Sequence, residues 1–188
     1  MPRGASGLSM AAGLFLVGIG PGGVGGMTLD AISTAKNADF RRYEAYTALW
    51  SRDDLENLEG EIGEIQKVMR PEVEDPVELL ELAKTHSVAL LVVGDPLQAT
   101  THVDLQLQAL EAGVQCTVIH GVAITSLVTG AVGLSNYRFG RQTTLTYPYG
   151  GWVATSPLEV IAVNRIQGLH TLVLLDLDPT GEGVGGQK

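Results

Sequence analysis

The run Val-Ala-Leu-Leu-Val-Val-Gly-Asp-Pro at residues 88–96 decides the fold of this chain. Its first six residues are all apolar, which predicts a strand buried on both faces. Gly94 permits a close backbone approach, Pro96 cannot continue the hydrogen-bond ladder, and Asp95 is left at the carboxyl end of the strand. Ligands of open α/β sheets bind at that end, so a site is expected here.

Strand and helix patterns alternate on both sides of this segment. The predicted strands are residues 14–20, 40–43, 63–68, 88–93 and 114–120. The predicted helices are residues 28–38, 53–58, 72–84, 102–113 and 124–133. In the helix at 102–113, the inward side chains are expected to be Val103, Leu105, Leu107 and Leu110. The alternation predicts a helix-covered parallel sheet, formed by residues 14–135 as an N-terminal α/β domain.

The character of the sequence changes after residue 134. A strand at residues 143–147, a helix from Ser156 as N-cap with Pro157 in its first turn, and a strand at residues 169–177 follow. These elements predict the start of a second α/β domain over residues 136–178. Residues 1–13 are expected to be a flexible extension and residues 179–188 a disordered tail.

Composition excludes several classes of function. The 188 residues carry a formal net charge of −9, which argues against nucleic acid as a partner because phosphate contacts need clustered Lys and Arg. Cys116 is the only cysteine and the four histidines are scattered, so no disulfide within the chain and no metal site are expected. No apolar run is long enough for a secretion signal or a membrane span, which predicts a cytoplasmic protein without a membrane partner.

Three glycine-bearing loops follow predicted strands, at residues 18–23, 94–102 and 120–126. They contain no catalytic triad, metal cluster or phosphate-binding loop, so the catalytic group stays unknown, and His120 fits a structural or a functional role. The pattern indicates a cofactor-binding domain whose cofactor brings the reactive group. The spacing Gly-x-Gly-x-x-Gly from Gly18 also allows a plain turn or a dinucleotide site, but no acid follows a second strand as nicotinamide binding requires.

Four strings carry a resemblance to a known family. They are Leu-Val-Gly-Ile-Gly-Pro-Gly at residues 16–22, Tyr-Glu-Ala-Tyr-Thr at 43–47, Gly-Asp-Pro-Leu-Gln-Ala-Thr-Thr-His at 94–102 and Gly-Leu-His-Thr-Leu-Val-Leu-Leu-Asp at 168–176. Over residues 14–177 the chain resembles the diphthine synthases, which belong to the tetrapyrrole (corrin/porphyrin) methylase superfamily. The first string and the Gly-Asp-Pro element are shared across the superfamily, whereas the longer strings are specific to diphthine synthases.

The resemblance implies a homodimeric enzyme that transfers methyl groups from S-adenosylmethionine to an amino group of the modified histidine of translation elongation factor 2, in the diphthamide pathway. S-adenosylhomocysteine is the product. The resemblance assigns cofactor contacts to Pro21, Asp95, Gln98, Ala123, Ile124 and Leu175. It assigns the substrate side to Tyr46, Thr47, Tyr149 and Trp152. For Tyr46, the simpler interpretation is an aromatic side chain half-buried at the edge of the sheet. Asp95 is expected to hold the cofactor and not to act as the base.

The sequence departs from the family at its end. The second domain of the family continues beyond the strand that matches residues 169–177 and completes the adenine side of the pocket, so an incomplete second α/β domain is expected here. Two alternatives stay open. One is a methyltransferase that acts on a tetrapyrrole precursor, and the other is a truncated homologue that keeps the fold without catalysis.

Overall fold

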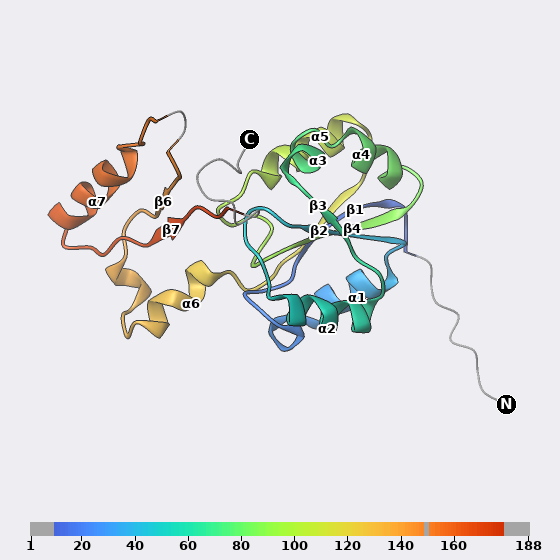
Figure 1. The fold of residues 1–188 in the computed structure, drawn as a ribbon, viewed down its shortest axis with the longest axis horizontal. Coiled ribbons are helices and arrows are strands. Elements are labelled where there is room, and N and C mark those ends of the chain that lie inside the picture. The colour runs from blue at the N-terminus through green and yellow to red at the C-terminus, as the bar shows by residue number, and fades with distance from the viewer. Residues whose placement is uncertain (1–9, 149–150, 179–188) are drawn as a thin grey trace. The chain divides into compact units, whose positions relative to one another are not determined.

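The structure is a computed structural model in which residues 10–148 and 151–178 are described (Figure 1). The chain forms two compact units that divide between Ala123 and Ile124. The alternation of strands and helices in the sequence predicts the junction after residue 135, with the helix at 124–133 as one more crossover of the sheet. The strand before it is an edge strand, however, and helix α6 (Ile124–Ala131) contacts the 3-10 turn η2 (Asn136–Arg138) of the second unit.

The first unit is built on a sheet of five strands in the order β3-β2-β4-β1-β5, in which all neighbours are parallel. The strands are β1 (Gly13–Gly18), β2 (Phe40–Glu44), β3 (Gln66–Val68), β4 (Ser87–Val92) and β5 (Cys116–Ile119). All six residues of β4 are buried, because this strand has a neighbour at each edge and helices over each face. The predicted parallel sheet is confirmed.

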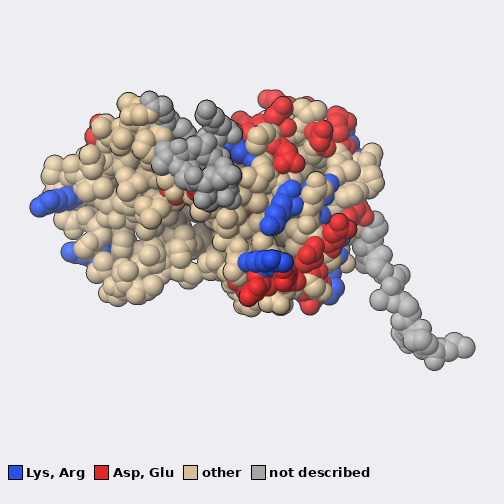
Figure 2. Space-filling model, in the orientation of Figure 1, with Lys and Arg blue, Asp and Glu red and all other residues tan. Residues whose placement is uncertain are grey.

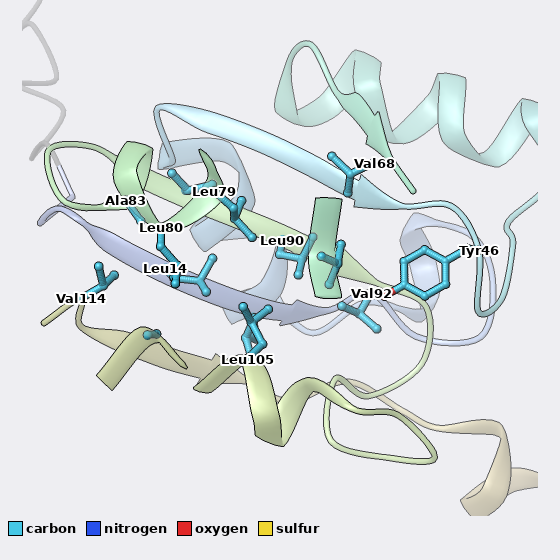
Figure 3. Close-up of a cluster of buried hydrophobic side chains, with 14 residues drawn as sticks. Leu14, Tyr46, Val68, Leu79, Leu80, Ala83, Leu90, Val92, Leu105 and Val114 are labelled. Carbon is cyan, nitrogen blue, oxygen red and sulfur yellow. The ribbon is translucent and has the colours of Figure 1, made fainter. Parts of the chain in front are cut away.

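Helices cover both faces of this sheet (Figure 1). α1 (Leu29–Asn37) and α2 (Arg52–Ile62) lie on one face; α3 (Arg70–Glu74), α4 (Val77–Ala83) and α5 (His102–Glu111) lie on the other. Successive residues of β4 point to opposite faces, so Leu90 belongs to the cluster under α4 and α5 and Leu91 to the cluster under α1 and α2. Figure 3 shows the first of these clusters.

Two helices differ from the sequence pattern. The single helix expected at residues 72–84 is two helices, α3 and α4, with Pro76 between them, because proline has no N–H to donate and clashes with the preceding turn. In α5 the prediction of the inward face is wrong for three of its four residues, namely Val103, Leu107 and Leu110, which are exposed. The helix buries His102, Leu105 and Ala109 instead, since the imidazole of His102 is held from several sides.

The second unit contains a parallel pair of strands, β6 (Thr143–Leu145) and β7 (Val173–Leu175), and helix α7 (Ser156–Ile166), which contacts β6. Thr155 is the N-cap of α7, one residue earlier than the sequence predicts. The buried side chain of Asn164 joins the helix to its surroundings. Its Nδ2 donates to the carbonyl of Arg141 and to Thr171 Oγ1, each over 2.8 Å, and its Oδ1 accepts from the Arg141 N–H over 3.1 Å.

Charge is unevenly distributed between the two units. On the face drawn in Figure 2, Asp and Glu gather over the helices of the first unit, whereas the second unit presents few charged side chains. Among the residues that the structure describes, none of the helices is both long and apolar enough to cross a bilayer.

Candidate active site

The loops after β1 and β4 are joined by backbone hydrogen bonds at the carboxyl edge of the sheet. The N–H of Gly94 donates to the carbonyl of Gly20 over 2.8 Å, and the N–H of Gly20 donates to the carbonyl of Gly94 over 3.1 Å. Trp50, which is buried, adds a third bond, because its Nε1 donates to the same Gly20 carbonyl over 3.1 Å. These bonds therefore hold the loop after β1 and the loop after β4 together, although the two loops are far apart in the sequence.

The loop after β5 joins the other two through glycine packing. A Cβ built on Gly121 would lie 2.2 Å from the carbonyl oxygen of Gly94 and 2.7 Å from the carbonyl carbon of Gly18, and a Cβ on Gly18 would lie 2.5 Å from Gly121 N. Gly94 itself has φ +77°, a conformation that L side chains rarely adopt. The glycines at the three strand ends are thus required for backbone contact, a reason that the sequence pattern alone does not reveal.

Asp95 ties the loops after β4 and β5 together with its side chain, which is almost fully buried. Its Oδ1 accepts from the N–H of Leu97 over 2.9 Å. Its Oδ2 lies 2.8 Å from His120 Nδ1 and accepts from the N–H of Gly121 over 3.3 Å. Both carboxylate oxygens are therefore engaged by the protein, whereas the side chain of His120 is 70% exposed.

Of the six residues predicted to contact a cofactor, the first unit brings four to this edge. Pro21 directly follows Gly20, and the N–H of Gln98 donates to the carbonyl of Asp95 over 3.1 Å. Ala123 is buried beside Gly94, with its Cα 3.7 Å from an ideal Cβ on that glycine. The side chains of Pro21 and Gln98 are exposed.

The remaining two, Ile124 and Leu175, belong to the second unit, where both are exposed. The first unit by itself therefore assembles Pro21, Asp95, Gln98 and Ala123 and does not include the other two. No metal-binding group of three or more His, Cys, Asp or Glu side chains occurs in the part of the chain that the structure describes.

Tyr46, which the resemblance assigns to the substrate side, is buried in the core of the first unit. Its side chain is buried against the cluster that contains Val68 and Val92 (Figure 3), and the guanidinium of Arg70 lies 4.9 Å from its ring centre. Burial raises the pKa of Tyr46 well above its usual range. Thr47 is exposed, as is Trp152 in the second unit, and Tyr149 lies outside the described residues.

The far end of the loop after β4 is held by a residue that the sequence pattern did not single out. His102 Nδ1 lies 3.0 Å from the carbonyl oxygen of Pro96 and 2.9 Å from Thr100 Oγ1. Between them, Ala99 adopts φ +56°, which a residue with a side chain keeps only when its surroundings impose it. The available signal in the sequence was the position of this histidine, at the end of the string at residues 94–102 and at the start of a predicted helix.

A parallel, helix-covered sheet whose glycine loops meet at the carboxyl edge is the architecture of an α/β domain that binds a small molecule at its strand ends. Comparison with known proteins identifies the family. The sequence model of the Tetrapyrrole (Corrin/Porphyrin) Methylases matches residues 13–180, and the chain belongs to this family.

Its relatives include diphthine synthases, as the motifs predict. The chain is 39% identical over 148 residues to the diphthine synthase of Methanoregula boonei, covering 78% of this chain and 59% of that protein. It is 40% identical over 156 residues to the diphthine synthase of Methanocorpusculum labreanum, covering 82% and 61%. A crystal structure of diphthine synthase matches with a TM-score of 0.79 and 36% identity, covering 88% of this chain and 65% of that one. The chain thus spans less than two thirds of each of these relatives.

Proposed function

We propose that this protein is an S-adenosylmethionine-dependent methyltransferase of diphthine synthesis, which methylates the amino group of the modified histidine of translation elongation factor 2. The observation that carries the proposal is the junction of the Gly-Asp-Pro loop with the loops after β1 and β5, because it brings two of the strings that resemble diphthine synthases, at residues 16–22 and 94–102, into contact at one edge of the sheet. The similarity to named diphthine synthases favours this substrate over a tetrapyrrole precursor.

The residues at this edge suit S-adenosylmethionine in charge and leave backbone open to a ligand. The sulfonium of that cofactor is positive, and the Asp95 carboxylate supplies a fixed negative charge beside the loops. A Cβ on Gly22, next to Pro21, would meet nothing within 4 Å, so the backbone there is open to a ligand. Pro21, Asp95, Gln98 and Ala123 of the first unit would hold the cofactor, and for Ile124 and Leu175 the assignment rests on the family resemblance alone.

When bound, the cofactor supplies an electrophilic methyl group, so the protein needs no nucleophile of its own. The task of the chain is to hold the acceptor amine in line with the methyl group, and such orientation can contribute about 7–11 kcal/mol to a reaction of this type. The hydrogen bonds between Gly20 and Gly94 and the buried Asp95 keep this edge rigid without ligand. That rigidity favours catalysis by positioning.

The cytoplasmic location and the homodimer are further parts of the proposal. The homodimer rests on the family resemblance, and the cytoplasmic location rests on the sequence composition. Elongation factor 2 is the proposed protein partner, and neither nucleic acid nor a membrane is part of the proposed activity.

Calorimetric titration of the 188-residue chain with S-adenosylhomocysteine tests cofactor binding, and mass spectrometry of elongation factor 2 bearing the aminocarboxypropyl-histidine tests methylation. We expect saturable binding and methyl addition. Asp95→Ala should abolish binding. His86→Gln, a substitution at an exposed position before the start of β4 and away from these loops, should leave binding unchanged. Methylation of a porphyrinoid without methylation of elongation factor 2 would favour the tetrapyrrole alternative. Absence of binding and of methylation would favour the non-catalytic one.

A further inference from the structure

Asp95 and His120 form a carboxylate–imidazole pair with one buried and one exposed member. The carboxylate is 9% exposed, and its Oδ2 lies 2.8 Å from His120 Nδ1. The imidazole is 70% exposed, and its Nε2 makes no hydrogen bond with any described residue. A carboxylate can only accept, so the proton of a neutral imidazole resides on Nδ1 and the lone pair on Nε2 is free.

This tautomer is the one that a general base requires. The same arrangement, in which a buried carboxylate orients an imidazole with a free nitrogen, removes the proton of the nucleophile in serine hydrolases. From this geometry we propose, on the basis of the proposed function, that His120 is the general base of methyl transfer and that Asp95 is its positioning residue.

An alkyl ammonium has no lone pair, so one N–H bond breaks and its proton moves to His120 Nε2, leaving a neutral amine. The amine lone pair then forms the C–N bond while the C–S bond breaks, and its electron pair stays on sulfur as the thioether. The proton leaves His120 for solvent, since the ring is open to water.

Three other titratable groups near this edge are too buried for this role, and the partly exposed Asp54 beside Gly23 accepts a hydrogen bond from Ser51 Oγ over 2.7 Å. Glu44 and His102 are each 1% exposed in their side chains, and Tyr46 is buried in the core with a raised pKa. The carboxylate of Asp95 is engaged through both oxygens. Of the described groups around the three loops, His120 therefore combines a free nitrogen with access to solvent.

The kinetic test compares His120→Gln with the matched variant His86→Gln. General base catalysis contributes typically 10²–10⁴-fold, so kcat of His120→Gln should fall by about 10²-fold or more while its affinity for S-adenosylhomocysteine changes by less than about threefold. His86→Gln should keep the kcat of the unmodified chain. Imidazole added to His120→Ala should restore part of the lost rate, a rescue that a purely structural role would not produce.

Nitrogen NMR of the imidazole rings supplies a readout that is independent of activity. In the free protein, Nδ1 of neutral His120 should be protonated and Nε2 not. Asp95→Asn should reverse this tautomer, because an amide N–H in place of Oδ2 donates to Nδ1. A proton on Nε2 in the unmodified chain would overturn the assignment.

The outcomes separate the inference from the proposed function. If the unmodified chain methylates elongation factor 2 and His120→Gln does so at the same rate, His120 is not the base and the proposed function stands. If the unmodified chain binds no S-adenosylhomocysteine and transfers no methyl group, the proposed function and this inference both fail.

Discussion

Glu44 Oε2 and His102 Nε2 lie 2.5 Å apart, and each side chain is 1% exposed. The distance is that of an ion pair, although the geometry is not that of a hydrogen bond, and neither atom has a hydrogen-bond partner elsewhere in the described structure. Glu44 ends β2 and His102 begins α5, so the contact joins the end of β2 to the far end of the loop that follows β4, its neighbour in the sheet. It also joins two of the four strings on which the family resemblance rests, which the sequence alone could not relate.

Removal of one member of this pair should destabilise the fold strongly. Glu44→Ala leaves His102 Nε2 buried without a partner, and loss of one partner from a buried pair typically costs about 3–5 kcal/mol. Urea unfolding followed by circular dichroism should show a decrease of this size. The exposed pair Lys36–Glu61, at 2.9 Å, is the control, because Glu61→Ala should cost less than about 1 kcal/mol. Equal losses in the two variants would refute a special role of the buried pair.

Addition of one methyl group at Gly121 should disrupt the junction of the loops. The Cβ of Gly121→Ala would lie 2.2 Å from the carbonyl oxygen of Gly94, and backbone atoms must move to accommodate it. We expect a loss of about 1–3 kcal/mol in unfolding free energy and weaker binding of S-adenosylhomocysteine. Gly60→Ala, in α2 with open space around the new methyl group, should instead stabilise the protein by about 0.5–1 kcal/mol. Normal stability of Gly121→Ala would contradict the packing argument.

The second unit depends on the amide of Asn164. Asn164→Ala removes the hydrogen-bond partner of three groups: the backbone N–H of Arg141, the carbonyl of Arg141 and Thr171 Oγ1. A buried polar group that is left without a partner costs about 1–3 kcal/mol in unfolding free energy. Hydrogen exchange should therefore accelerate in β6 and α7 and stay unchanged in β4. Asn37→Ala on the exposed end of α1 is the matched control and should alter exchange little. Uniform acceleration across both units would contradict this expectation.

Cys116 should react slowly at neutral pH. Burial raises the pKa of the Cys116 thiol from its ordinary value of 9.0 to about 11, because it disfavours the thiolate. The pH dependence of alkylation by iodoacetamide should thus have its midpoint near 11 in the folded chain and near 9 in urea. Since the folded pKa is the higher one, the associated stability is present below about pH 9 and is lost as the pH rises towards 11. A folded-state midpoint near 9 would show that the thiol is solvated.

Periodicity predicted the elements of the first unit well because its signals are local. An apolar run such as residues 88–93 is buried when a strand lies on each side of it and helices cover both faces of the sheet. β4 meets both conditions, because it lies between β2 and β1. The inward face of α5 could not be predicted in this way. Val103, Leu107 and Leu110 are apolar but exposed, since the buried contacts of His102 decide how the helix is rotated.

The sequence by itself determined the fold class, the family and the three strand ends at which a ligand is expected, because these depend on runs of residue types and on strings that are contiguous in the chain. Only the tertiary structure decided that Gly18, Gly94 and Gly121 touch through their backbones, that Asp95 orients His120 and that Glu44 meets His102. The physical reason is that a parallel sheet places strands side by side in an order that differs from the order of the chain. Contacts between their loops then depend on distances of a few ångströms that no local pattern encodes.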